Sequence, residues 1–439
     1  MTRPRQRDEW LAIFANGQPA GTLVRNDTHG GLDFYYLAPW FGSETAYPLS
    51  LDLPLGATHF RDETIAAHLR GLLPDSPARL ARVAAAAGVR ADDPFGLLTH
   101  YGEDCPGAYQ FVQPDRAGLI GGEPLRLEWL TDATLAERLR ALAPDGTSAG
   151  SDDVPGWFSL PGALPKLSLR WDTKKERWGL PQGRAASTHI AKLPLAGLRA
   201  HAENEHLCLA LARVGAGLAA ARSRILRVED QTALVVERFD RARGGREIVR
   251  IHQEDFGLAL GGAPEIRYPA QGAPGLQDMI ALLRKHTSYT SPEVARLVQS
   301  VAFNWLIGGA DAHLRNYAVL IEEGARVSLA PLFDLASAAM LDVVAKKPGR
   351  GDDERFAMNI GGAGHFHEIG RAEWAVELAA ASLDVGASLE AIRALGKRTL
   401  EALPAVVAAE VDAGDVAADI GADFVARVGR FVKRRIASL

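Results

Sequence analysis

An amphipathic helix and the polar segment that follows it constrain this chain more than any other feature. From Val294 to Trp305, apolar residues recur at the spacing of one helical face, and Ser291 and Pro292 suit the N-cap and first helical positions. Gly308-Gly309 then ends the helix, because glycine tolerates the left-handed conformation of a C-cap. The sequence therefore predicts that the polar residues beginning at Asp311 lie on a loop just beyond a well-buried helix.

The composition indicates a cytoplasmic protein with more than one domain. The 439 residues exceed one ordinary hydrophobic core, and the formal net charge of -5 argues against a surface that coats nucleic acid. Two cysteines, Cys105 and Cys208, fit neither a disulfide framework nor a zinc site and suit a reducing compartment. No apolar run approaches the ~18 residues that span a bilayer. The polar N-terminus lacks a secretion signal, so we expect no membrane partner.

Turn signals and hydrophobic periodicity predict a small α+β subdomain over residues 1–115. Its first strands form a meander with a type I′ turn at Asn16-Gly17, and two helical stretches and a short strand follow. Residues 116–155 are expected to form a linker, with one short helix and a mobile polar cluster at residues 145–153.

The remainder of the chain is predicted to form one larger domain over residues 156–405, followed by C-terminal helices over residues 406–439. Strand signals dominate from residue 156 to about 245, whereas helical periodicity dominates from about residue 246. One hairpin, near residues 317–330, is the single interruption expected late in this helical part. The expected fold class is α+β, with a strand-rich lobe followed by a largely helical lobe.

The polar segment carries the residues that phosphoryl transfer requires. That chemistry needs Mg²⁺ held by oxygen ligands, a cation on the phosphates, a backbone cradle and a carboxylate that takes the acceptor's hydroxyl proton. Asp311 and Asn316 have the Asp-to-Asn spacing of the protein-kinase catalytic loop, and a predicted hairpin separates them from Asp334. This order predicts an ATP- and Mg²⁺-dependent phosphotransferase. The alternative is a polar cluster that only caps the helix.

Three further segments supply the other parts of such a site. Lys192 lies on a predicted strand, from which it can reach the phosphates; a lysine that only protects a sheet edge is the alternative. Glu205, near the start of a helical run, can orient Lys192. The sequence SLPGALPK at residues 159–166 is the candidate phosphate loop, although one glycine matches neither a Walker A nor a kinase glycine-rich loop. Residues 234–241, an apolar strand that enters a charged segment, can hinge two lobes beside the adenine, or form a salt-bridged strand end.

Together these segments resemble the HipA family of serine/threonine kinase toxins, in the family's order and over nearly the whole chain. The matching stretches are residues 47–54, 72–75, 102–108, 159–166, 188–194, 204–205, 236–241, 252–255, 303–308, 311–316 and 331–334. The resemblance implies a two-lobed protein-kinase-like fold, related to lipid kinases, behind a small N-terminal subdomain. Leu164 stands where many family loops have glutamine, so one side-chain contact is expected to be absent.

The resemblance also implies roles for individual residues. Asp311 is the implied catalytic base, Asn316 and Asp334 the magnesium ligands, and Lys192 a phosphate contact. Ser159 matches the position at which family members autophosphorylate and thereby silence the kinase. The implied ATP-binding residues are Pro161, Gly162, Ala163, Leu164, Pro165, Lys166, Lys192, Glu237, Arg238, Phe239, His313, Leu314, Arg315, Asn316, Phe333 and Asp334.

Partners follow from the same resemblance. A helix-turn-helix antitoxin of HipB type is implied, with operator DNA bound mainly through that antitoxin. A cellular protein is the implied substrate, for which an aminoacyl-tRNA synthetase is the family example. Two other functions stay open: a small-molecule kinase, and an ATP-binding co-regulator that acts with a DNA-binding antitoxin. The complete set of Asp311, Asn316, Asp334 and Lys192 disfavours the co-regulator, because a binding module needs no general base.

Overall fold

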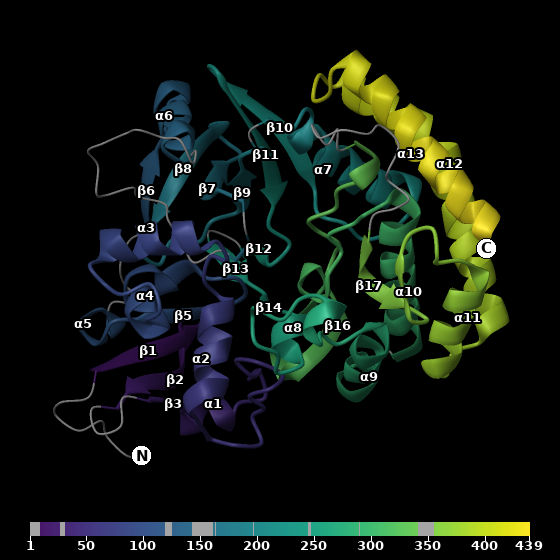
Figure 1. The fold of residues 1–439 in the computed structure, drawn as a ribbon. Coiled ribbons are helices and arrows are strands. Elements are labelled where there is room, and N and C mark those ends of the chain that lie inside the picture. The colour runs from purple at the N-terminus through teal and green to yellow at the C-terminus, as the bar shows by residue number, and fades with distance from the viewer. Residues whose placement is uncertain are drawn as a thin grey trace.

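The computed structural model describes residues 9–26, 31–118, 125–142, 161–162, 164–195, 197–244, 247–288, 290–340 and 355–439. An N-terminal α+β unit, a sheet-centred unit and a helical unit follow one another in chain order (Figure 1). The two long C-terminal helices run along the edge of the molecule that lies farthest from the N-terminal unit (Figure 1).

An antiparallel sheet with the order β4-β3-β2-β1-β5 forms the N-terminal unit. Asn16 and Gly17 have positive φ angles of 47° and 81°, which confirms the predicted type I′ turn between β1 and β2. The strands are β1 (Glu9–Ala15), β2 (Gln18–Arg25), β3 (Leu32–Tyr36), β4 (His59–Arg61) and β5 (Tyr109–Val112). The helices are α1 (Ala38–Phe41), α2 (Asp62–Gly71), α3 (Pro77–Ala87), α4 (Pro94–Tyr101) and α5 (Pro114–Ala117).

A second sheet, with the order β10-β11-β9-β7-β8-β6, has a helix on each face. Side chains of a strand alternate between faces. Val235 therefore packs with the residues under α6 (Asp132–Leu142), whereas Leu234 and Val236 pack in the cluster that includes α7 (His201–Ala210). The strands are β6 (Arg126–Trp129), β7 (Lys166–Asp172), β8 (Arg177–Gln182), β9 (His189–Lys192), β10 (Ser223–Val228) and β11 (Gln231–Glu237).

Part of the segment predicted as a linker, residues 116–155, folds onto this second sheet. β6 pairs with β8, and Leu135 and Leu139 of α6 are buried against the strands. The short helix was predicted, but nothing in its local pattern indicates a sheet whose other strands come later in the chain. The polar cluster at residues 145–153 lies outside the described residues.

Short strands connect the sheet-centred and helical units. β14 (His252–Asp255) pairs with β15 (Ala318–Glu322), which pairs with β16 (Arg326–Leu329), so the predicted hairpin near residues 317–330 is confirmed. β12 (Arg241–Gly244) and β13 (Glu247–Arg250) form another hairpin.

The expectation of a single hairpin in the helical part is wrong, because β17 (Arg355–Ile360) and β18 (Ala363–His365) form a second one. Their pairing is irregular and short, so the alternation that signals a strand is weak here. Gly361 and Gly362, with φ angles of 56° and 91°, were the available turn signal.

Helices form most of the rest of the chain. They are α8 (Phe256–Ala259), α9 (Leu276–His286), α10 (Thr290–Ile307), α11 (Arg371–Ala380), α12 (Val385–Asp412) and α13 (Ala418–Ser438). In α10 the predicted apolar stripe is buried, and Gly308 ends the helix with a φ of 79°. The helix begins at Thr290, so Ser291 lies inside the first turn and not at the N-cap. No helix in the described part of the chain is long and apolar enough to cross a membrane.

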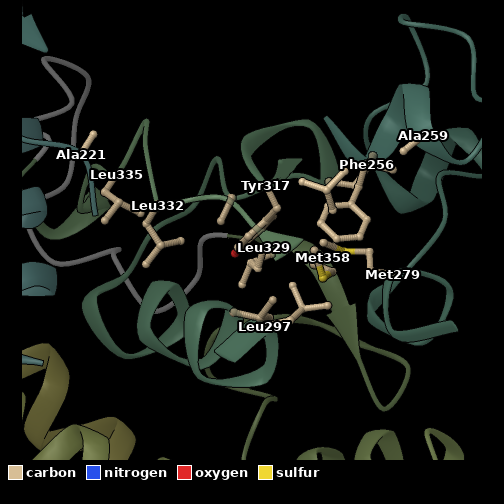
Figure 2. Close-up of a cluster of buried hydrophobic side chains, with 14 of the residues drawn as sticks. Ala221, Phe256, Ala259, Met279, Leu297, Tyr317, Leu329, Leu332, Leu335 and Met358 are labelled. Carbon is tan, nitrogen blue, oxygen red and sulfur yellow. The ribbon is translucent and has the colours of Figure 1, made fainter. Parts of the chain in front are cut away.

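A cluster of buried hydrophobic side chains in the helical unit includes residues next to the predicted polar residues in the sequence (Figure 2). Tyr317, which follows Asn316, is buried in this cluster, as are Leu332 and Leu335, which flank Asp334. The N–H of Leu332 donates to the carbonyl of Ala219, and the N–H of Ala221 donates to the carbonyl of Leu332, both at 2.8 Å. Burial and these bonds therefore fix the backbone on both sides of the polar residues.

A buried ion cluster joins the N-terminal unit to the sheet-centred unit. Asp104 of the N-terminal unit is fully buried and pairs with Arg241 at 3.0 Å and Arg250 at 3.2 Å. Its carboxylate also accepts hydrogen bonds from the N–H and the hydroxyl of Ser187, at 3.0 and 2.6 Å. Burial raises the pKa of Asp104 most, yet the surrounding guanidinium groups and Ser187 together hold that pKa below its usual range.

We expect Asp104→Asn to lower the free energy of unfolding by about 3–5 kcal/mol, because the substitution removes the carboxylate that pairs with buried Arg250 and one of the two carboxylates that pair with Arg241. Urea unfolding at pH 7 measures this change. Asp92→Asn is the matched control: Asp92 pairs with Arg90 on the surface, and its loss is expected to change stability little. Equal effects of the two substitutions would contradict a structural role for the buried cluster.

Candidate functional site

The predicted catalytic loop is compact and follows α10 immediately. The amide of Asn316 donates to the carbonyl of Asp311 at 2.7 Å, so the two residues close one loop. Inside it, the N–H of His313 donates to the carbonyl of Asp311, and the N–H of Asn316 to the carbonyl of His313, both at 2.8 Å. Leu314 is buried below the loop, whereas Asp311 is exposed. The Asp311 carboxylate therefore faces solvent from a loop whose backbone is held by hydrogen bonds.

Lys192 joins the sheet-centred and helical units through two carboxylates. Its Nζ lies 2.6 Å from Oε1 of Glu205 on α7, and it also pairs with Oδ1 of Asp334. Lys192 and Glu205 are buried, while the Asp334 side chain is about one-third exposed. We call these three residues the Lys192 cluster. Asp334 has a φ of 53°, a left-handed conformation that a non-glycine residue adopts at a cost and that is frequent at functional sites.

A second lysine lies beside the first. Lys166 of β7 and Lys192 of β9 are direct cross-strand partners, and the Lys166 Nζ donates to the carbonyl of Pro161 at 2.7 Å. Burial, together with the neighbouring charges of Lys192 and Arg79, lowers the pKa of Lys166 to about 7. Two cations at one strand end suit a polyphosphate. Gly162 has a φ of 110°, a backbone conformation that residues with a side chain rarely adopt, so this position favours glycine.

The N-terminal unit contacts the backbone of the candidate phosphate loop. The sequence analysis did not predict this contact. Arg79 of α3 donates to the carbonyls of Leu164 and Lys166 at 2.8 and 2.9 Å. The N–H of Asp75 also approaches the carbonyl of Gly162 at 3.4 Å. Ala163 and Ser159 lie outside the described residues. Residues 72–75, Leu-Leu-Pro-Asp, match the family in sequence, but that match does not indicate that Asp75 contacts the phosphate loop.

Arg315, predicted to bind nucleotide, has its guanidinium in buried ion pairs. It lies 3.1 Å from Asp255 at the end of β14 and 3.1 Å from Asp75 of the N-terminal unit. It also donates to the carbonyls of Gly71 and Pro264. The Arg315 side chain therefore ties the catalytic loop to the N-terminal unit.

The predicted hinge behaves in the same way. The Arg238 side chain is buried in ion pairs with Asp240 and Asp104. The backbone N–H of Arg238 donates to the carbonyl of Thr188 at 2.9 Å. The two aromatic residues assigned to the nucleotide are brought together: the Phe239 and Phe333 ring centroids lie 5.5 Å apart. Both rings are half-buried, so they offer an apolar wall to a planar base.

The residues present fit the groups that the sequence implies. Carboxylate and amide oxygens are the donors that Mg²⁺ prefers, and Asn316 retains its amide oxygen because its nitrogen makes the bond to Asp311. Asp334 supplies a carboxylate that is accessible to solvent and is already balanced by a cation. The site thus combines hard oxygen donors, two lysines and a solvent-facing carboxylate.

Known proteins resemble this chain in sequence. The family described as HipA-like C-terminal domain matches residues 158–407, and HipA N-terminal domain matches residues 11–112. A Sinorhizobium fredii protein named "Putative kinase Y4mE" is 34% identical over 333 residues, which cover 74% of this chain and 77% of that protein. The "Serine/threonine-protein kinase toxin HipA" of Shewanella oneidensis is 27% identical over 357 residues, 77% of each protein.

A solved structure shares the fold over almost the whole length. It contains HipA of the Shewanella oneidensis toxin–antitoxin system in a complex with HipB and operator DNA. The TM-score is 0.79 at 23% identity, and the match covers 97% of this chain and 96% of that one. This match confirms the predicted two-lobed kinase-like α+β fold.

We expect the affinity of the site for a nucleotide to depend on Lys166 and on pH. A bound phosphate favours the charged amine, whose pKa in the free protein is about 7, so binding takes up a proton above that pH. The ratio by which the unchanged chain binds the nucleotide more tightly than Lys166→Met should therefore be largest at pH 6. It should shrink by up to about tenfold per pH unit above pH 7.

Calorimetric titration of both proteins with an ATP analogue between pH 6 and pH 9 measures this ratio. Taking the ratio of the two dissociation constants cancels the titration of the ligand's own phosphates. Lys166→Arg keeps a cation at every pH and should follow the slope of Lys166→Met. A ratio that stays constant from pH 6 to pH 9 would contradict a phosphate contact by Lys166.

Proposed function

The chain belongs to the HipA family and is a serine/threonine-protein kinase, and from this premise we propose how its own residues act. We propose that it transfers the terminal phosphoryl group of ATP to a serine or threonine hydroxyl of another protein. The bond between the β–γ bridging oxygen and the terminal phosphorus breaks, and the acceptor oxygen bonds to that phosphorus. ADP leaves, and the hydroxyl proton passes to the carboxylate of Asp311.

The observation that carries this proposal is the meeting of Lys192, Glu205 and Asp334 in one cluster. The segment after Asp334 is joined to the start of the Asp311 loop, because the N–H of Ala338 donates to the carbonyl of Gly308 at 2.8 Å. Each member of the Lys192 cluster has a separate task. Glu205 holds the lysine in place, Lys192 would contact the phosphates, and Asp334 would be a metal ligand. When bound, Mg²⁺ neutralises charge that develops on the transferred group. Asn316 and Asp334 are the residues that would hold it.

The nucleotide base would lie against the Phe239 and Phe333 pair, with the Glu237–Phe239 backbone at its edge. The phosphates would lie along residues 161–166, near both lysines. Ion pairs of Arg315 and Arg238 with Asp75 and Asp240 hold the backbone of the catalytic loop and of the hinge in place. The proposal therefore assigns a backbone or structural role to both arginines.

We further propose that the kinase is the toxin of a toxin–antitoxin pair in the cytoplasm. The relative from Shewanella oneidensis is named a kinase toxin, and its solved complex contains HipB and operator DNA. A helix-turn-helix antitoxin of HipB type would bind this chain and carry the contact to DNA. The substrate would be a cellular protein, such as an aminoacyl-tRNA synthetase.

Autophosphorylation at Ser159 belongs to the same proposal. Ser159 lies two positions before Pro161, whose carbonyl accepts the Lys166 amine at 2.7 Å. A phosphate on that serine would compete for Lys166 and displace the loop that has to hold ATP. The catalytic centre would then be silenced through its own phosphate loop.

Asp311→Asn should lower transfer by about 10²–10⁴-fold, because the amide keeps the shape of the carboxylate but cannot take the acceptor's proton. Incubation of each variant with a cell extract and γ-labelled ATP measures label in protein. Asp92→Asn, on the surface of the N-terminal unit, is the control and should transfer at the normal rate. Unchanged labelling by Asp311→Asn would refute the role of Asp311, and label in small molecules alone would refute a protein acceptor.

Expression of the unchanged chain without a partner should slow bacterial growth, and Asp311→Asn should not, because toxicity requires the transfer reaction. Co-expression of a HipB-type protein encoded beside the chain should restore growth. Growth curves, with immunoblots to equalise protein levels, provide the measurement. Equal toxicity of both variants would show that any growth effect arises without catalysis.

A further inference from the structure

Tyr268 makes a contact with the proposed catalytic base that the sequence analysis did not identify. Its hydroxyl donates to Oδ1 of Asp311 at 2.8 Å, although the two residues are 43 positions apart. The tyrosine is 38% exposed, so burial of its ring does not explain its location. Its ring meets the edge of the His313 ring, with centroids 5.5 Å apart and an interplanar angle of 77°.

The segment that carries Tyr268 is held in place by local bonds. Oε1 of Gln271 accepts the N–H groups of Arg267 and Tyr268 at 2.9 and 3.1 Å. Gly272 ends the short turn with a φ of 80°, and Arg267 pairs with Asp75 of the N-terminal unit at 2.9 Å. The Tyr268 hydroxyl thus reaches Asp311 from a turn that its own hydrogen bonds order. The Arg267–Asp75 pair fixes this turn to the N-terminal unit.

The chemistry of the two groups sets the direction of the hydrogen bond. Burial and the adjacent Asp311 carboxylate raise the pKa of Tyr268 to about 12, so the phenol keeps its proton at neutral pH and donates. Asn316 bonds the backbone carbonyl of Asp311 and leaves the carboxylate untouched. Among the described residues, Tyr268 is the one hydrogen-bond donor to that carboxylate.

We propose that Tyr268 is a positioning residue for the base: its hydroxyl holds Oδ1 of Asp311 and thereby aims Oδ2 at the acceptor hydroxyl. The inference rests on the proposed function, in which Asp311 takes the acceptor's proton. A carboxylate that rotates freely spends less time in the orientation that accepts the proton, and misplacement lowers the rate of the chemical step. Binding of ATP does not depend on that orientation.

Tyr268→Phe tests the hydroxyl alone, because the ring keeps its contact with His313. The rate of label transfer to extract proteins at saturating ATP should fall about tenfold or more, the size expected for one hydrogen bond to a charged group. The ATP concentration that gives half the maximal rate and the melting temperature should stay unchanged. Tyr35→Phe, on β3 of the N-terminal unit, is the control and should leave the transfer rate and the half-saturating ATP concentration unchanged.

Combination with Asp311→Asn separates positioning from a general structural effect. If Tyr268 acts through the carboxylate, Tyr268→Phe should have almost no effect once Asp311 is replaced, and the two losses should not multiply. Multiplying losses would overturn the proposal, and so would an unchanged rate in the single variant.

A rate that rises in Tyr268→Phe would also overturn it, since the phenol would then be occupying the acceptor's place. Failure of the proposed function and failure of the positioning role give different results. Normal transfer by Asp311→Asn would refute the proposed function itself, whereas loss by Asp311→Asn with normal transfer by Tyr268→Phe would refute only the positioning role.

Discussion

The pairing of the buried Lys192 amine with Glu205 and Asp334 is the interaction on which the rest of the site depends. A buried charge is tolerated only when it is paired, and Lys192 has its partners on α7 and on the segment after β16. The amine is therefore satisfied only when the second sheet, its helix and the helical unit are all assembled. Lys192 and Asp334 therefore take the positions that phosphoryl transfer needs only when these parts of the chain have folded together.

The N-terminal unit is part of this arrangement and is not a separate attachment. Asp75 pairs with Arg315 of the catalytic loop, Arg79 holds the backbone of the phosphate loop, and Asp104 is embedded among arginines of the sheet-centred unit. Loss of the unit would remove one carboxylate partner from each of Arg315, Arg241 and Arg250, all of which have buried side chains. Its charges explain why a subdomain with no proposed catalytic residue has such close contact with both loops.

Local patterns were sufficient for the elements that carry the site. The buried stripe of α10, its glycine end and the β15–β16 hairpin were all predicted, because each depends on residues close together in the chain. The second hairpin and the attachment of residues 126–142 to the second sheet were not. In the first case the strands are short and irregularly paired, and in the second the pairing partner, β8, comes much later.

The sequence by itself determined the chemical types at the site: a carboxylate and an amide five positions apart, a later aspartate, a strand lysine, and a second lysine in the candidate phosphate loop. Their order along the chain was enough to predict a phosphotransferase of kinase type. Only the tertiary structure decided that Arg315 and Arg238 support the loops from behind, that Arg79 holds the phosphate loop, and that Tyr268 contacts Asp311. These contacts join residues far apart in the chain, and side-chain direction across such a gap depends on packing and not on spacing.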